Sequence, residues 1–189
     1  MIDQVNDTGF VHRIDSNGRI SFVNEAWIAF AAKNGYQTTR SAQLGRPLLS
    51  VIGGHENRHI YGLLIDRARA TRKPITFGYR CDSPAERRWM QMRMRYRPDD
   101  GEVEFDSLML KRERRAPVRL LEIQRDDSRS GDLLSMCSWC KTVRAGDSWI
   151  EVEQAVTRLG LFAIDKIPRI SHGICPGCRT RLSSLETTS

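Results

Sequence analysis

Two pairs of cysteines are the residues whose types and spacing best suit a chemical task. Cys137 and Cys140 enclose Ser-Trp, and Cys175 and Cys178 enclose Pro-Gly. Two intervening residues let one tight turn bring both sulfurs to the same ion, while N–H groups of the turn spread the sulfur charge. Four thiolates in this pattern are typical of a tetrahedral structural zinc site. The spacing therefore predicts one Zn²⁺ bound by these four cysteines.

Two alternatives for these cysteines remain open. His172 precedes Cys175 by three residues, so it could replace one cysteine as a ligand, or support a thiolate from outside the ligand set. A redox-active pair would need a thioredoxin-type βαβ unit beside it, and the sequence shows none. Cys81, the fifth cysteine, is interpreted as a buried thiol on a strand.

The segment His55-Glu56-Asn57-Arg58-His59 matches the zinc-metalloprotease motif, in which two histidines bind zinc and the glutamate activates water. Gly53-Gly54 comes directly before it, so His55 is expected at a helix edge rather than inside a helix. No third ligand follows in a similar setting. The sequence favours a polar helix start, with Glu56 near the positive end of the helix dipole, over a metallohydrolase.

The elements that must position these residues follow from the hydrophobic pattern. Residues 10–15 and 20–24 are expected to form a hairpin, followed by a helix that ends near Asn34-Gly35 and a longer helix over 56–70. Three alternating segments then predict three strands, which begin near residues 75, 90 and 103. The order predicts an α+β fold, with a five-stranded antiparallel sheet and helices packed on one side.

The segment Asp15-Ser-Asn-Gly-Arg-Ile-Ser-Phe-Val-Asn24, with Trp27 after it, resembles the opening hairpin of PAS domains. Gly45 and the apolar residues after it are similar to the middle helices of that family. The resemblance covers about residues 8–112 and implies a sensor domain that binds a ligand or a partner. Oxygen-sensing members bind haem through a histidine on the long helix, which makes His59 a candidate haem ligand if it faces the sheet.

A second resemblance concerns the cysteines. Met136-Cys-Ser-Trp-Cys-Lys141 and Ser171-His-Gly-Ile-Cys-Pro-Gly-Cys178 are similar to a C-terminal module of bacterial PAS and response-regulator proteins. A turn, a β-rich middle and a helix that carries the second pair are typical of treble-clef or zinc-ribbon sites. The resemblance implies a signalling context and no catalytic residue. The expected organisation is a PAS-like domain (8–112), a charged linker (113–133) and a zinc-binding module (134–186).

Composition limits the remaining possibilities. The 189 residues carry a net charge of +7 and suit two small domains. No signal peptide or apolar membrane span is evident, which predicts a cytoplasmic protein. The stretch Lys111–Arg125 holds six basic and two acidic residues. We interpret it as a solvated linker, with a patch for nucleic acid or an acidic partner as the alternative.

No nucleophile, base and orienting group can be assembled from local motifs, so we do not expect an enzyme. The leading hypothesis is a cytoplasmic bacterial regulatory protein with a PAS-like domain and a zinc module that contacts another protein. One alternative is a nucleic-acid-binding regulator that uses the zinc module and the basic stretch. Another is a metallohydrolase or haem sensor at His55 and His59. A homodimer is also an expectation.

Overall fold

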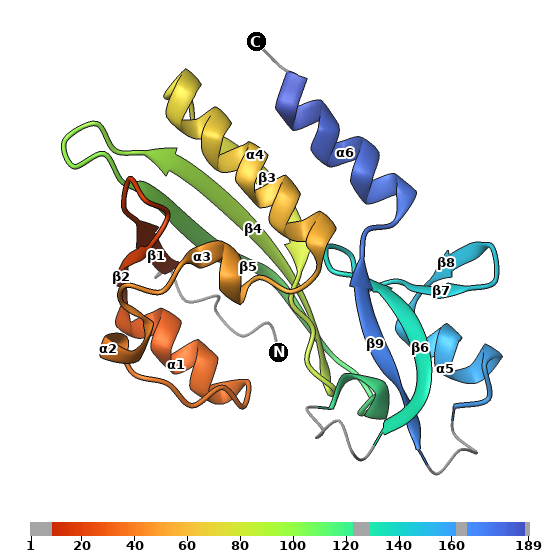
Figure 1. Ribbon diagram of the computed structural model, residues 1–189. Helices are drawn as coiled ribbons and strands as arrows, with labels where there is room; N and C mark the ends of the chain where they lie inside the picture. The colour runs from red at the N-terminus through yellow and green to blue at the C-terminus, as the bar shows by residue number, and fades with distance from the viewer. Residues whose placement is uncertain (1–8, 123–128, 162–165, 188–189) are drawn as a thin grey trace.

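The computed structural model describes residues 9–122, 129–161 and 166–187 (Figure 1). Among these residues, the N-terminal part contains a five-stranded antiparallel sheet with helices, and the C-terminal part contains a four-stranded sheet with two more helices. The predicted α+β class and the five-stranded antiparallel sheet are therefore confirmed.

The first two strands form the predicted hairpin. They are β1 (Phe10–Ile14) and β2 (Ile20–Val23), paired antiparallel. A carboxylate oxygen of Asp15 accepts hydrogen bonds from the backbone N–H groups of Asn17 and Arg19, at 2.9 Å each. This side chain satisfies backbone groups that the tight turn leaves without partners in the strands.

Helix α1 (Glu25–Lys33) begins at a side-chain cap. Oδ1 of Asn24 accepts hydrogen bonds from the backbone N–H of Trp27 at 2.9 Å and from that of Val11 at 3.1 Å. One asparagine therefore caps the helix and also ties its start to β1. The helix ends at Lys33 and is capped by Asn34, close to the end predicted near Asn34-Gly35.

Three helices lead from the hairpin to the rest of the sheet. They are α2 (Arg40–Gln43), α3 (Leu48–Val51) and α4 (His55–Thr71). Apolar residues at helical spacing form the buried face of α4, namely Ile60, Leu64, Ile65 and Ala68. In Figure 1, α4 lies across one face of the sheet, as the predicted layer arrangement requires.

The sheet is completed by β3 (Ile75–Arg80), β4 (Glu86–Tyr96) and β5 (Val103–Arg114), and its strand order is β2-β1-β5-β4-β3. β3 and β2 are therefore its two edges. The alternation predicted for β4 is observed, because its three methionines, Met90, Met92 and Met94, are all buried. Met92 and Met94 pack in a main core with residues of α4, β3 and β5.

Part of the stretch predicted as a linker (113–133) is in strands. β5 continues to Arg114, because the start of the basic stretch pairs with the first residues of β4, and the next strand already begins at Arg129. Residues 115–122 include a short 3-10 helix, η1 (Arg119–Leu121), and residues 123–128 lie outside the described residues. The division of the chain into domains stays a prediction.

The second sheet has the order β8-β7-β6-β9. Its strands are β6 (Arg129–Cys137), β7 (Val143–Ala145), β8 (Ser148–Ile150) and β9 (Ile167–Gly173). β6 and β9 pair in parallel, with α5 (Val152–Arg158) in the connection between β8 and β9. The chain then enters α6 (Pro176–Thr187), which begins directly after Cys175 and contains Cys178 in its first turn.

The two sheets share a core. The main core contains Leu64, Phe77 and Phe105 from the first part, and also Trp139, Leu182 and three of the paired cysteines from the second. A separate small core joins the second sheet to η1 and α5. It is formed by Val118, Leu120, Met136, Val143, Val152, Ala155, Val156, Leu161 and Ile167. The cysteine side of the C-terminal part is thus packed against the N-terminal sheet.

Gly54 allows a close approach between the two parts. Its φ is +83°, and a Cβ atom there would lie 2.7 Å from the carbonyl oxygen of His172. Gly45 has a similar φ of +79° but no heavy atom within 4 Å of its Cβ position. The backbone angle favours glycine at both positions, whereas a close steric contact is present only at Gly54.

We predict that Gly54→Ala destabilises the protein more than Gly45→Ala, by about 1–3 kcal/mol, because only the first substitution forces a methyl group against backbone of the other part. Urea unfolding of both variants and the wild type measures this difference. Equal losses of unfolding free energy would contradict the close approach.

Candidate metal centre

The four paired cysteines meet at one point. Cys137 ends β6, Cys140 follows one turn later, Cys175 directly precedes α6, and Cys178 lies in its first turn. Their sulfur atoms all lie within 4.8 Å of one another, and those of Cys140 and Cys175 are 3.6 Å apart. Four sulfurs at about 2.3 Å from a tetrahedral zinc would be about 3.8 Å apart. The group could therefore bind a metal ion such as zinc.

The first pair sits in a tight turn that its own backbone holds. The N–H of Lys141 donates to the carbonyl of Cys137 at 2.9 Å, and the N–H of Cys137 donates to the carbonyl of Thr142 at 2.8 Å. Lys141 has a φ of +62°, in the left-handed region. We call residues 137–142 the knuckle. Its backbone conformation turns the chain so that Cys140 faces the same point as Cys137.

Polar donors surround the sulfurs. A guanidinium N–H of Arg181 donates to the sulfur of Cys178 at 2.9 Å, and the backbone N–H of Cys178 donates to the sulfur of Cys175 at 3.4 Å. The second pair also lies at the N-terminal, positive end of α6. These groups offset the negative charge that four thiolates would carry, as expected around a metal bound by cysteine.

The sulfurs also change one another's acidity. A hydrogen bond with Cys140 raises the pKa of Cys137, and a hydrogen bond with Cys137 raises the pKa of Cys178. The hydrogen bond with Cys137 lowers the pKa of Cys140. A metal that binds all four sulfurs must displace the protons that the first two hold. Metal affinity is therefore expected to fall as the pH falls.

His172 lies on β9 and is exposed, and it is not among the clustered ligand residues. Its contact with Gly54 is made by its backbone carbonyl and Cβ. Cys81 is half-buried just after β3, as a free thiol apart from the four clustered cysteines.

The metalloprotease-like motif has a different role. His55 is the first residue of α4, and both it and His59 are exposed, so His59 does not face the sheet as a haem ligand would. The carboxylate of Glu56 pairs with Arg179 of α6 at 2.6 Å. In the described parts of the chain, the four cysteines are the only group of three or more potential metal ligands close together.

Asn57, in the middle of that motif, binds the knuckle instead. It is 3% exposed, its Nδ2 donates to the hydroxyl of Ser138 at 2.6 Å, and its Oδ1 accepts from the indole N–H of Trp139 at 3.2 Å. The Trp139 ring lies 5.4 Å from that of Tyr61 and 5.0 Å from that of Phe77, centroid to centroid. The knuckle is therefore docked between α4 and β3 by its tryptophan.

Sequence reasoning missed this docking site. Two signals were present in the sequence. A large apolar residue, Trp139, lies between the two cysteines of a turn, and Asn57 lies near the start of a helix that follows two glycines. Neither identifies the other as its partner, because 82 positions separate Trp139 from Asn57.

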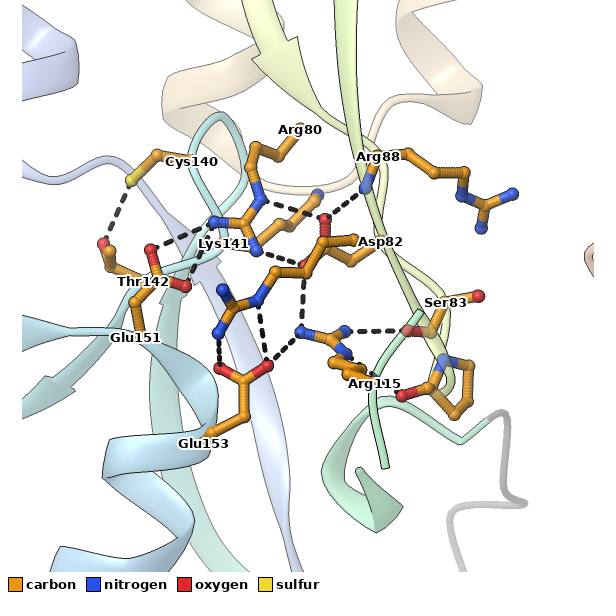
Figure 2. A network of polar contacts seen from close by, with 12 residues as sticks. Arg80, Asp82, Ser83, Arg88, Arg115, Cys140, Lys141, Thr142, Glu151 and Glu153 are labelled. Atoms are coloured by element: carbon orange, nitrogen blue, oxygen red, sulfur yellow. Dashed lines mark hydrogen bonds and ion pairs between the residues drawn. The ribbon is translucent and has the colours of Figure 1, made fainter. Parts of the chain in front are cut away.

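A buried polar network joins the two parts beside the knuckle (Figure 2). The carboxylate of Asp82 is fully buried and pairs with Arg80 and Arg115, whose side chains are each 8% exposed. These arginines also pair with Glu151 and Glu153 at the start of α5. Arg115 belongs to the stretch that we interpreted as a solvated linker, so that interpretation is wrong for this residue.

Comparison with known proteins adds no assignment: no family model matches the chain, and no curated protein matches it significantly. Among the described residues, no helix is both long and apolar enough to cross a membrane.

We predict that replacing Cys175 and Cys178 together with serine abolishes metal binding, because two of four thiolates are lost. Metal analysis of purified protein measures the content per chain. Cys81→Ser is the matched control and should retain one metal. If the double variant kept its metal, or if His59→Ala lost one, the cysteine site would be the wrong assignment.

We predict that the free energy of unfolding depends on pH through the carboxylate of Glu153. Burial alone would raise its pKa, but hydrogen bonds from Arg87 and Arg115 outweigh burial and lower the pKa from 4.5 to about 2. The stabilisation is therefore complete above pH 4.5 and is lost as the pH falls from there toward 2. Between pH 7 and 3.5 this carboxylate should account for at most about 1.4 kcal/mol of lost unfolding free energy.

Urea unfolding at the two pH values should show a smaller loss for Glu153→Gln than for the wild type. Glu25→Gln, which alters an 83% exposed carboxylate, should keep the wild-type loss. Identical pH dependence in all three proteins would contradict the lowered pKa.

Proposed function

We propose that this chain is a regulatory protein in which a PAS-like sensor domain and a structural zinc module form one unit. The observation that carries the proposal is the docking of Trp139: the residues between two cysteine ligands fill a site made by α4 and β3 of the sensor-like part. In this proposal, zinc holds the knuckle in the conformation that fits there.

The PAS-like assignment is supported by element order. Two strands, a series of helices and three strands carry the resemblance in the sequence, and the same order forms the antiparallel sheet. The hairpin segment that resembles the family ends at Asn24, whose side chain joins β1 to α1. A sensor domain of this kind would respond to a ligand or a partner.

A structural rather than catalytic zinc is supported by the ligand set. Four cysteines complete a tetrahedral site and leave no position for water or substrate, whereas catalytic zinc keeps one position open. Three of the four are buried. Arg181 is hydrogen-bonded to the sulfur of Cys178, and Thr142 to that of Cys140. In this role the metal contributes folding free energy, and the module offers a surface to another protein.

The test is to remove the metal with a chelator and to follow Trp139. The difference between the emission of the wild type and that of Trp139→Phe isolates this residue from the other tryptophans. We expect its emission to move to longer wavelength on chelation, together with a lower melting temperature, because the knuckle leaves its buried site. Added Zn²⁺ should reverse both changes.

Cys81→Ser should behave as the wild type in this experiment. If chelation left the Trp139 emission and the melting temperature unchanged, the metal would not hold the two parts together, and the proposed structural role would be rejected.

A further inference from the structure

β3 is an edge strand, and among the described residues no strand pairs with its outer side. In an antiparallel pair, residues alternately direct their N–H and C=O groups toward the neighbouring strand and away from it. The N–H of Cys81, directly after β3, donates toward β4, to the carbonyl of Arg88. The N–H of Arg80 points the other way and donates to the carbonyl of Trp139 at 2.6 Å. By this alternation, Thr76 and Gly78 direct their backbone groups away from β4, and both residues are exposed.

The knuckle already accepts one hydrogen bond from this edge. Trp139 uses the first outward-facing position, at Arg80, and the positions at Gly78 and Thr76 continue the same row. A cavity of about 500 Å³ runs along this row. Its walls include Leu182 and Leu185 of α6. A segment laid there would extend the pairing that Trp139 begins.

The cavity suits a polypeptide with apolar side chains. Leu110 and Trp89, on the neighbouring strands, line it, and Leu110 is 55% exposed. Gly78 places no side chain in the path of an added strand. In an added strand, main-chain hydrogen bonds provide affinity and alternate side chains enter pockets.

The rim of this edge is positively charged. Lys73 precedes β3, Arg93 is the cross-strand partner of Thr76, and Arg181 lies on α6 at the cavity wall. In the residues that the structure describes, none of these three has a carboxylate within 4.0 Å, although Arg181 also donates to the sulfur of Cys178 at 2.9 Å. The acidic residue at the cavity, Glu151, is already paired with Arg80. Acidic side chains on the added strand would complement this rim, whereas a second copy of the chain would bring like charges together.

We infer that the free edge of β3 binds an extended, acidic segment of a partner protein, which pairs with Thr76 and Gly78 as an added strand. The inference rests on the proposed role in protein contact and names the surface and the kind of partner. The docked knuckle limits the site at one end, and Arg181 contributes both to the cysteine site and to the rim.

The test uses a labelled octapeptide of alternating valine and glutamate, (Val-Glu)₄, with (Val-Lys)₄ as its control, on metal-loaded protein. Fluorescence anisotropy should show binding of the glutamate peptide and at least tenfold weaker binding of the lysine peptide. Amide hydrogen exchange should slow at Thr76 and Gly78, while Phe77 and Tyr79, already paired with β4, stay unchanged.

Two variants give a matched comparison. Lys73→Glu should weaken binding of the glutamate peptide at least tenfold, and Lys33→Glu, on α1 away from this edge, should leave it unchanged. Thr76→Pro removes one edge N–H without breaking the β3–β4 pairing and should also abolish the added protection.

The inference is overturned if the glutamate peptide does not bind, if both peptides bind equally, or if binding leaves Thr76 and Gly78 unprotected. Protection of these amides by self-association, measured by sedimentation, would also overturn it, because a second copy would then occupy the edge. Metal content and melting temperature of the same sample separate this failure from that of the proposed function. A zinc-stabilised protein that ignores the peptide rejects only the added strand.

Discussion

The carbonyl oxygen of Trp139 and the amide of Arg80 share a hydrogen bond at the point where the second part of the chain meets the edge of the first sheet. The indole of the same residue is hydrogen-bonded to Asn57 and packed on two aromatic rings. A short loop loses conformational entropy when it docks in one geometry. Cysteine ligands at both ends of the loop reduce that loss, because a metal would fix the loop before it docks.

The buried charges beside the knuckle act on the relative position of the two parts. The carboxylate of Asp82 is fully buried and contacts both Arg80 and Arg115. Leaving a buried carboxylate without its partner costs about 3–5 kcal/mol, whereas the complete pair adds little net stability. The network therefore selects the arrangement in which Arg80 and Arg115 also reach α5, through Glu151 and Glu153.

Local rules explain what the sequence could predict. The hairpin, the ends of α1, the alternation of β4 and the clustering of four cysteines all depend on residues close together in the chain or on a fixed ligand spacing. The parallel pairing of β6 with β9 and the docking of Trp139 depend on partners far apart, and no periodicity in either segment indicates them. The metalloprotease-like motif misleads for the same reason, because its residues contact distant parts of the chain. Glu56 pairs with Arg179, Asn57 donates to Ser138, and Gly54, just before the motif, lies against His172.

The parallel pairing of β6 and β9 has a consequence for the order of synthesis. Carboxyl ends of parallel strands lie together, so the knuckle and the second cysteine pair become neighbours only after β9 has left the ribosome. Before that, a metal cannot be bound by all four sulfurs, so the docking of Trp139 on Tyr61 and Phe77 depends on the contacts of the knuckle alone.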